Sequence, residues 1–126
     1  MSRLLVVDDE ANIRLLYAEE LKDQGHEVVT AATSAEAVEK LQGGFFDLAV
    51  LDIKLKNESG IELLQKLVKE RHDMPVILCS AFSCYKDDFS AWLADSYVVK
   101  SGDLTELKEE IKRVLAKKAQ RRAAGM

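Results

Sequence analysis

The stretch Leu48-Ala49-Val50-Leu51-Asp52 consists of four apolar residues followed by one carboxylate. A short apolar run with polar residues on both sides is typical of a strand that is buried on both faces, as in parallel sheets. An acid at the carboxyl end of such a strand lies where open α/β sheets hold their ligands. Three other predicted strands also end in side chains that can bind ions or phosphate: Asp8 and Asp9, Ser80, and Lys100.

The composition is that of one globular domain and excludes several functional classes. The chain has 126 residues, of which 48% are hydrophobic and 32% charged, and this length can bury a single core. The net charge of −4 argues against general binding to nucleic acid or to an anionic membrane. No apolar run approaches the roughly 20 residues of a membrane span, and the first predicted strand leaves no room for a signal peptide. We therefore expect a cytoplasmic protein whose two cysteines, Cys79 and Cys84, are structural thiols and not zinc ligands.

Predicted strands and helices alternate along the chain. Apolar or β-branched runs predict strands at 3–7, 27–31, 47–52, 76–79 and 96–99. Apolar residues spaced three and four apart predict helices at 11–24, 33–41, 60–71, 83–95 and 103–115. The residues from 117 onward are basic and rich in alanine, and we interpret them as a solvated, fraying extension of the last helix.

Local signals mark several helix ends. Thr33-Ser34-Ala35-Glu36 and Asp103-Leu104-Thr105-Glu106 are capping-box patterns, which open helices. Gly25 follows the first predicted helix, where a left-handed residue is favoured. Inside that helix Tyr17 belongs to the apolar face and Arg14 to the polar face.

Five strands that alternate with five helices imply right-handed crossovers and a parallel sheet covered on both faces. We predict a doubly wound, flavodoxin-like α/β fold with the strand order 2-1-3-4-5. In this order strands one, three, four and five lie side by side. Their carboxyl ends then gather five side chains around one crevice: Asp8, Asp9, Asp52, Ser80 and Lys100.

These residue types suit the chemistry of phosphoryl transfer. Converging carboxylates repel one another, and a divalent cation such as Mg²⁺ or Mn²⁺ relieves the repulsion. Lys100 supplies a positive charge and Ser80 a donor, so metal, ammonium and hydroxyl could each take one phosphoryl oxygen. An aspartate can itself be the nucleophile and form an aspartyl-phosphate. Asp52, at the centre of the sheet, is the candidate.

Over residues 3–117 this pattern resembles the receiver domains of two-component response regulators, which have the CheY-like fold. Residues 118–126 then form a basic tail. The positions that carry the resemblance are the acidic pair Asp8-Asp9, Asp52, Ser80 in Cys79-Ser80-Ala81, and Tyr97 three residues before Lys100. The resemblance implies that Asp52 accepts phosphate from the phosphohistidine of a histidine kinase or phosphotransfer protein. It also implies a signalling domain, not an enzyme, although the domain assists its own phosphotransfer and autodephosphorylation.

The resemblance further implies a role for each site residue. Asp9 would bind Mg²⁺ directly and Asp8 through water, with Asp52 and the backbone carbonyl of Lys54 as the remaining protein ligands. Lys100 would contact the phosphoryl group.

The switch that the resemblance implies involves Ser80 and Tyr97. Ser80 would move toward the phosphoryl group and Tyr97 would turn inward. The face made by residues 83–95, 96–99 and 103–115 would then change, for binding to a downstream target or output domain or for dimerisation.

Two features depart from the family pattern or modify it. Lys100 is followed by Ser101, where the family usually has a proline after a cis bond. A cis bond before a non-proline residue costs about 3 kcal/mol, so the isomer stays open. Lys54 and Phe82 lie two residues beyond Asp52 and Ser80, at family positions that influence hydrolysis of the acyl phosphate. Both are bulky enough to obstruct the attacking water, so we predict slow autodephosphorylation.

Several alternatives stay open at this point. A phosphatase of the haloacid dehalogenase type would need a second acid two residues after the nucleophile, where this chain has Lys54. A flavodoxin-like cofactor module would need a phosphate loop of amides, hydroxyls and glycine, whereas Asp8-Asp9-Glu10 would repel a phosphate. A degenerate receiver that binds partners without phosphorylation is supported only by the Lys100-Ser101 junction. Asp8 and Asp9 could also simply cap the first helix.

Overall fold

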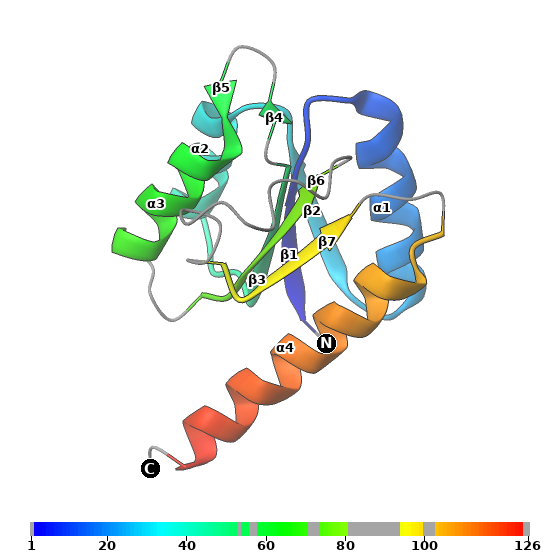
Figure 1. Ribbon diagram of the computed structural model, residues 1–126, viewed down its shortest axis with the longest axis vertical. Helices are drawn as coiled ribbons and strands as arrows, with labels where there is room; N and C mark the ends of the chain where they lie inside the picture. Colours follow the sequence, from blue (N-terminus) through cyan, green and yellow to red (C-terminus); the bar gives the residue numbers. More distant parts are fainter. Residues whose placement is uncertain are drawn as a thin grey trace.

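A five-stranded parallel sheet lies between two layers of helices in the computed structural model (Figure 1). The structure describes residues 2–52, 54–55, 58–70, 74–80, 94–99 and 103–124. The strands of the sheet are β1 Arg3–Val7, β2 Glu27–Ala31, β3 Leu48–Asp52, β6 Val76–Ser80 and β7 Ser96–Val99. Their order is β2-β1-β3-β6-β7, which confirms the predicted order 2-1-3-4-5.

Two more strands, β4 Lys54–Leu55 and β5 Glu58–Ser59, form a separate antiparallel pair directly after β3. This pair was not predicted, because two-residue strands are too short to show a hydrophobic period. It fixes the backbone of Lys54 opposite Ser59, two residues beyond the end of the central strand.

Four of the five predicted helices are present in the described residues. They are α1 Ala11–Asp23, α2 Ser34–Gln42, α3 Gly60–Glu70 and α4 Thr105–Ala124. The helix predicted at 83–95 falls almost entirely outside the described residues, together with Cys84. No helix in the described ranges is both long and apolar enough to cross a bilayer.

Successive residues of each strand face opposite helix layers, as the pleat of a strand requires. In β1, Leu5 and Val7 belong to the core that α2 and α3 cover, whereas Leu4 and Val6 belong to the core that α1 and α4 cover. All five residues of β3 are buried, which confirms that the central strand is covered on both faces.

Two predicted helix ends are confirmed in detail. The hydroxyl of Thr33 accepts a hydrogen bond of 3.1 Å from the amide of Glu36, which is one half of the capping box. Gly25 after α1 has a φ of 91°, in the left-handed region that favours glycine.

Removing the Thr33 cap is expected to destabilise the domain modestly. Thr33→Ala leaves one N-terminal amide of α2 without its acceptor and should cost about 1 kcal/mol of unfolding free energy. Urea unfolding followed by circular dichroism measures the loss. Thr33→Ser keeps the hydroxyl and should stay close to the unsubstituted protein. Equal losses in both variants would mean that the methyl group, not the cap, stabilises this helix.

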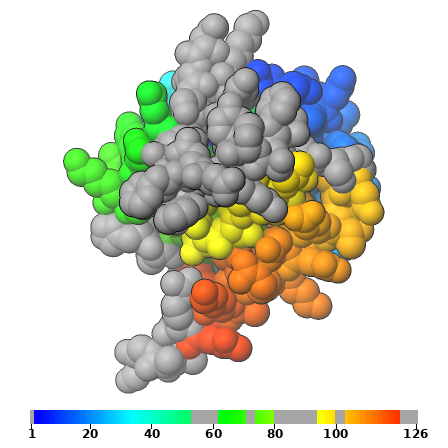
Figure 2. Space-filling model, viewed as in Figure 1, coloured from blue at the N-terminus to red at the C-terminus, as the bar shows by residue number. Residues whose placement is uncertain are grey.

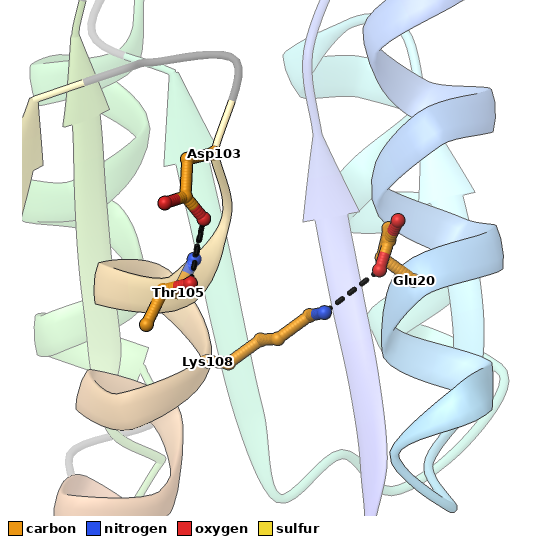
Figure 3. A network of polar contacts seen from close by, with 4 residues as sticks. All are labelled: Glu20, Asp103, Thr105 and Lys108. Atoms are coloured by element: carbon orange, nitrogen blue, oxygen red, sulfur yellow. Dashed lines mark hydrogen bonds and ion pairs between the residues drawn. The ribbon is translucent and has the colours of Figure 1, made fainter.

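The start of α4 differs from the predicted capping box. Asp103 accepts hydrogen bonds from the amide of Thr105 at 2.9 Å and from its hydroxyl at 2.6 Å (Figure 3). These two bonds from Thr105 lower the pKa of the Asp103 carboxyl. The helix therefore begins at Thr105, two residues later than predicted, with its first turn held by a local turn around Asp103.

The basic end of α4 is helical, but it is not simply solvated as predicted. The helix continues to Ala124, and its last turns project from the body of the domain (Figure 1). In the space-filling view its orange residues form the lower right part of the molecule (Figure 2). Lys118 is 7% exposed, and its ammonium donates to the carbonyl of Asp47 at 3.3 Å. The same ammonium lies 5.4 Å from the ring centroid of Phe45. Lys118 thus joins α4 to the loop before β3.

Candidate metal centre

Three carboxylates meet at the carboxyl end of the sheet. Val7 and Leu51 are register partners in the neighbouring strands β1 and β3, so the residues that follow them, Asp8 and Asp52, emerge side by side. One carboxylate oxygen from each of Asp8, Asp9 and Asp52 lies within 4.8 Å of the others. The strand order therefore brings the three acids together, as the sequence predicts.

The three acids differ in their exposure to solvent. Asp8 is 2% exposed and Asp52 is 6% exposed, whereas Asp9 is half-buried. Carboxylates at such short separation repel one another, and the repulsion is stronger where water is excluded. A cation placed among them would remove this repulsion. Hard carboxylate oxygens are the ligands that Mg²⁺ and Mn²⁺ prefer, so the donor set fits such an ion.

Hydrogen bonds from the main chain and from α1 fix the turn that carries Asp8. The Oδ1 atom of Asp8 accepts from the amide of Glu10 at 2.9 Å, and the amide of Asp8 donates to the carbonyl of Ala31 at 3.1 Å. The guanidinium of Arg14 donates to the carbonyl of Asp8 at 2.8 Å. Sequence reasoning missed this contact and assigned Arg14 to the outer face of the helix. The only available signal was its position in the first turns of α1, six residues after Asp8.

Tyr17 forms part of the wall beside the acids. It is 4% exposed and packs in the core beneath α1 and α4, together with Val50 and Cys79. Burial raises the pKa of the Tyr17 phenol, and the neighbouring Cys79, Asp8 and Asp52 raise it further. The phenol is therefore neutral at physiological pH and adds no charge to the site.

The other predicted site residues are described only in part. Ser80 ends β6 next to β3, where Asp52 is the register partner of Cys79, so its backbone lies at the same edge of the sheet. Lys54 lies in β4, and its backbone pairs with that of Ser59 in β5. Lys100, Ser101 and Phe82 lie outside the described residues.

Tyr97 lies in β7, at the edge of the sheet. It is half-buried and packs against the core that α2 and α3 cover, with Leu78 of β6 as its register partner. This position is compatible both with a packing aromatic and with the predicted switch.

Comparison with known proteins gives a consistent result. The family model for the response regulator receiver domain matches residues 4–112. The response regulator ArlR of Staphylococcus aureus is 28% identical over 123 residues, which cover 96% of this chain and 56% of ArlR. The chain thus spans about half the length of the curated relatives that it matches.

Solved structures of similar chains agree with the family match. TrrA of Thermotoga maritima, in complex with Mg²⁺ and BeF, is 47% identical with a TM-score of 0.86, covering 90% of this chain and 98% of TrrA. A second TrrA structure, in complex with the histidine kinase ThkA, is 47% identical with the same TM-score, covering 91% of this chain and 99% of TrrA. A CheY-like receiver domain from Methanospirillum hungatei is 33% identical with a TM-score of 0.90, covering 96% and 98% of the two chains. The acids lie at the predicted sheet edge, and the family model matches most of the chain, so the chain belongs to the response regulator receiver domain family.

Proposed function

We propose that this chain is a phosphorylation-switched receiver that accepts a phosphoryl group on Asp52 from a histidine kinase or phosphotransfer protein. The observation that carries this proposal is the convergence of Asp8, Asp9 and Asp52 within 4.8 Å at the carboxyl end of the sheet. Asp52 ends the central strand and is nearly buried, where a nucleophile is held in one orientation by its neighbours.

The reaction needs few groups. A carboxylate oxygen of Asp52 attacks phosphorus, the bond from phosphorus to the histidine nitrogen of the donor breaks, and that nitrogen keeps the electron pair. A bound Mg²⁺ or Mn²⁺ would supply charge neutralisation for the phosphoryl oxygens. Asp8, Asp9, Asp52 and the backbone carbonyl of Lys54 would hold it.

Two further side chains complete the proposed site. Lys100 and Ser80 each take one phosphoryl oxygen in this proposal, the first as a fixed positive charge and the second as a donor. Ser80 ends β6, and in the sequence Lys100 directly follows β7; both strands lie beyond β3 in the sheet, which supports assigning the two residues to the same edge.

The partners follow from the relatives. TrrA, which is 47% identical, has been solved in complex with the histidine kinase ThkA and also with Mg²⁺ and BeF. A kinase of this type is the proposed donor for the present chain. Movement of Ser80 and Tyr97 would then alter the face around β7 and α4, for a downstream protein, an output domain or a second copy of the chain.

Intact mass spectrometry tests the proposal directly. The protein is incubated with acetyl phosphate and Mg²⁺, and we expect the mass of one added phosphoryl group. Chelation of the metal by EDTA before the donor is added should prevent the gain, and hydroxylamine should remove it, because acyl phosphates react with hydroxylamine. A folded protein that gains no mass from acetyl phosphate or from a phosphorylated kinase would contradict the proposal and favour the degenerate receiver.

We also propose that Lys54 slows hydrolysis of the phosphorylated form. Lys54 lies two residues beyond Asp52 in the sequence, and its backbone pairs with Ser59 in β5. In this proposal its long side chain would obstruct the path of the attacking water. Lys54→Asn shortens this side chain, and the half-life of the phosphorylated protein should fall about three- to tenfold, a barrier change of about 0.7–1.4 kcal/mol. The decay of the phosphorylated mass over time measures it. Lys56→Asn makes the same change two residues further on and should leave the half-life unaltered; the same half-life in all three proteins would rule out this role.

A further inference from the structure

A groove lies between α1 and α4, away from the acidic cluster. Its volume is about 340 Å³, which is within the range of small-molecule sites in proteins. The groove is at the C-terminal end of α1, whereas Asp8 and Asp9 precede the N-terminal end of the same helix. Its lining includes Leu21, His26, Lys108, Ile111, Lys112 and Leu115.

The floor of the groove is aliphatic and already formed. Leu21 is 0% exposed and Ile111 is 1% exposed, and both belong to the core that α1 and α4 cover. Leu115 packs against the same core but keeps part of its surface open. A ligand chain in this groove would bury its own apolar surface and the open part of Leu115 without unfolding either helix.

The two helices are held together at one end of the groove. The ammonium of Lys108 lies 2.7 Å from a carboxylate oxygen of Glu20 (Figure 3). This ion pair joins residues that are 88 positions apart in the sequence, and it neutralises Lys108. The charge of Lys108 is therefore already balanced before any ligand enters.

Among the polar lining residues that the structure describes, one cation has no ion-pair partner. Lys112 lies one turn beyond Lys108 on α4, on the same face of the helix, and forms no ion pair with any residue in the described ranges. Burial lowers the pKa of His26, so its ring is mostly neutral at pH 7, and its Nδ1 has no hydrogen-bond partner. Among the residues that the structure describes, no carboxylate lines the groove. Within this part of the chain the groove therefore combines an aliphatic floor with a single unbalanced positive charge.

We propose that this groove is a second binding site, which takes a small amphiphilic monoanion: a carboxylate with a short aliphatic chain. The chain would lie on Leu21, Ile111 and Leu115. The carboxylate would pair with the ammonium of Lys112. A protein partner fits less well, because a standard interface buries about 800 Å² on each side and would extend far beyond a groove of this size.

Sodium octanoate is the probe for this site. In ¹⁵N–¹H correlation spectra of the whole chain, its addition should move the amide signals of residues 21–26 and 108–115 in a saturable way. The signals of Asp8, Asp9 and Asp52 should stay in place. We expect a dissociation constant of about 1 mM or tighter, as for other ligands of this size. Octanol, which has the same chain without the charge, should bind at least about tenfold more weakly.

A matched pair of variants separates this site from a general charge effect. Lys112→Glu should weaken octanoate binding at least about tenfold, whereas Lys117→Glu makes the same charge change on the same helix outside the lining and should not. Both residues are exposed, so neither change disturbs the core. Both variants should still take up phosphate from acetyl phosphate as the unsubstituted chain does, which keeps this test independent of the proposed function.

Three results would overturn the proposal. The first is the absence of saturable shifts with octanoate. The second is equal weakening by Lys112→Glu and Lys117→Glu, which would show a non-specific attraction. The third is movement of the groove signals with protein concentration in the absence of octanoate, which would show that a second copy of the chain covers the groove.

Discussion

Asp52→Asn is expected to abolish the mass gain that acetyl phosphate and Mg²⁺ produce in the unsubstituted protein. An amide is not a nucleophile toward phosphorus, so the bond from carboxylate oxygen to phosphorus cannot form. The substitution preserves the size of the side chain at the buried end of β3, where Asp52 is 6% exposed. We expect phosphorylation to fall below detection by intact mass spectrometry, at any donor concentration that phosphorylates the unsubstituted chain fully.

The other end of the same strand offers a matched control. Asp47 directly precedes β3, and its Oδ2 atom accepts a hydrogen bond of 2.8 Å from the backbone amide of Arg3. Asp47→Asn is expected to cost about 1 kcal/mol of unfolding free energy through this bond, while phosphate uptake continues. Uptake by both variants would identify another acceptor. Loss of uptake in Asp47→Asn as well, with normal circular dichroism, would show that the assay does not report on Asp52.

The architecture of the sheet could be predicted because its signals are local. Each central strand is a short apolar run, and burial on both faces follows from that run alone, as in Leu48–Asp52. The parallel order then determines which strand ends are neighbours. The pair β4–β5 escaped prediction because two residues show no period, although it determines where the backbone of Lys54 lies.

The behaviour of Lys118 could not be predicted in the same way. Lysine in a basic, alanine-rich segment normally lies in solvent, and the sequence gives no sign of its acceptor. The acceptor is the carbonyl of Asp47, 71 residues away, and the aromatic neighbour is Phe45 in the same loop. Ile111, Val114 and Lys118 are spaced three and four residues apart, so Lys118 occupies the next position on the buried face of α4.

The site shows the same division between local and distant information. Asp8, Asp9 and Asp52 could be predicted as neighbours, because strand ends in a parallel sheet meet at one edge. The contact of Arg14 with the carbonyl of Asp8 could not, because a helical period places arginine on a face but does not show that it reaches back to the preceding turn.

Asp8→Asn is expected to have opposite effects with and without metal. Without metal, the substitution removes one of three negative charges that lie within 4.8 Å of one another. A pair of charges at this separation repels by about 3 kcal/mol at an effective dielectric constant of about 20. Asparagine also keeps the oxygen that accepts from the amide of Glu10. The metal-free variant should therefore unfold at a higher temperature than the unsubstituted protein, with a gain of about 1–2 kcal/mol.

With Mg²⁺ the order should reverse or the difference should vanish. A cation that binds only the folded state stabilises it by an amount that grows with the ratio of its concentration to its dissociation constant. The unsubstituted protein should gain stability as Mg²⁺ rises to about ten times that constant, by about 1.4 kcal/mol. In Asp8→Asn the affinity for Mg²⁺ should fall at least about tenfold, and this gain should be lost. Thermal unfolding at several Mg²⁺ concentrations measures both effects.

Asp23→Asn is the control for the loss of one charge, because Asp23 is exposed at the far end of α1. This variant should change the free energy of unfolding without metal by no more than about 0.5 kcal/mol. Its gain in stability with Mg²⁺ should equal that of the unsubstituted protein. The contradictory result is a metal-free Asp8→Asn protein that is less stable than the unsubstituted chain. It would show that the negative charge of Asp8 stabilises the N-terminal end of α1, and that this stabilisation exceeds the repulsion of Asp8 from Asp9 and Asp52. The acids would then act as a helix cap, and Mg²⁺ should leave the unfolding temperature of both proteins unchanged. Only a repulsive cluster that Mg²⁺ relieves predicts higher stability without metal together with a lost response to it.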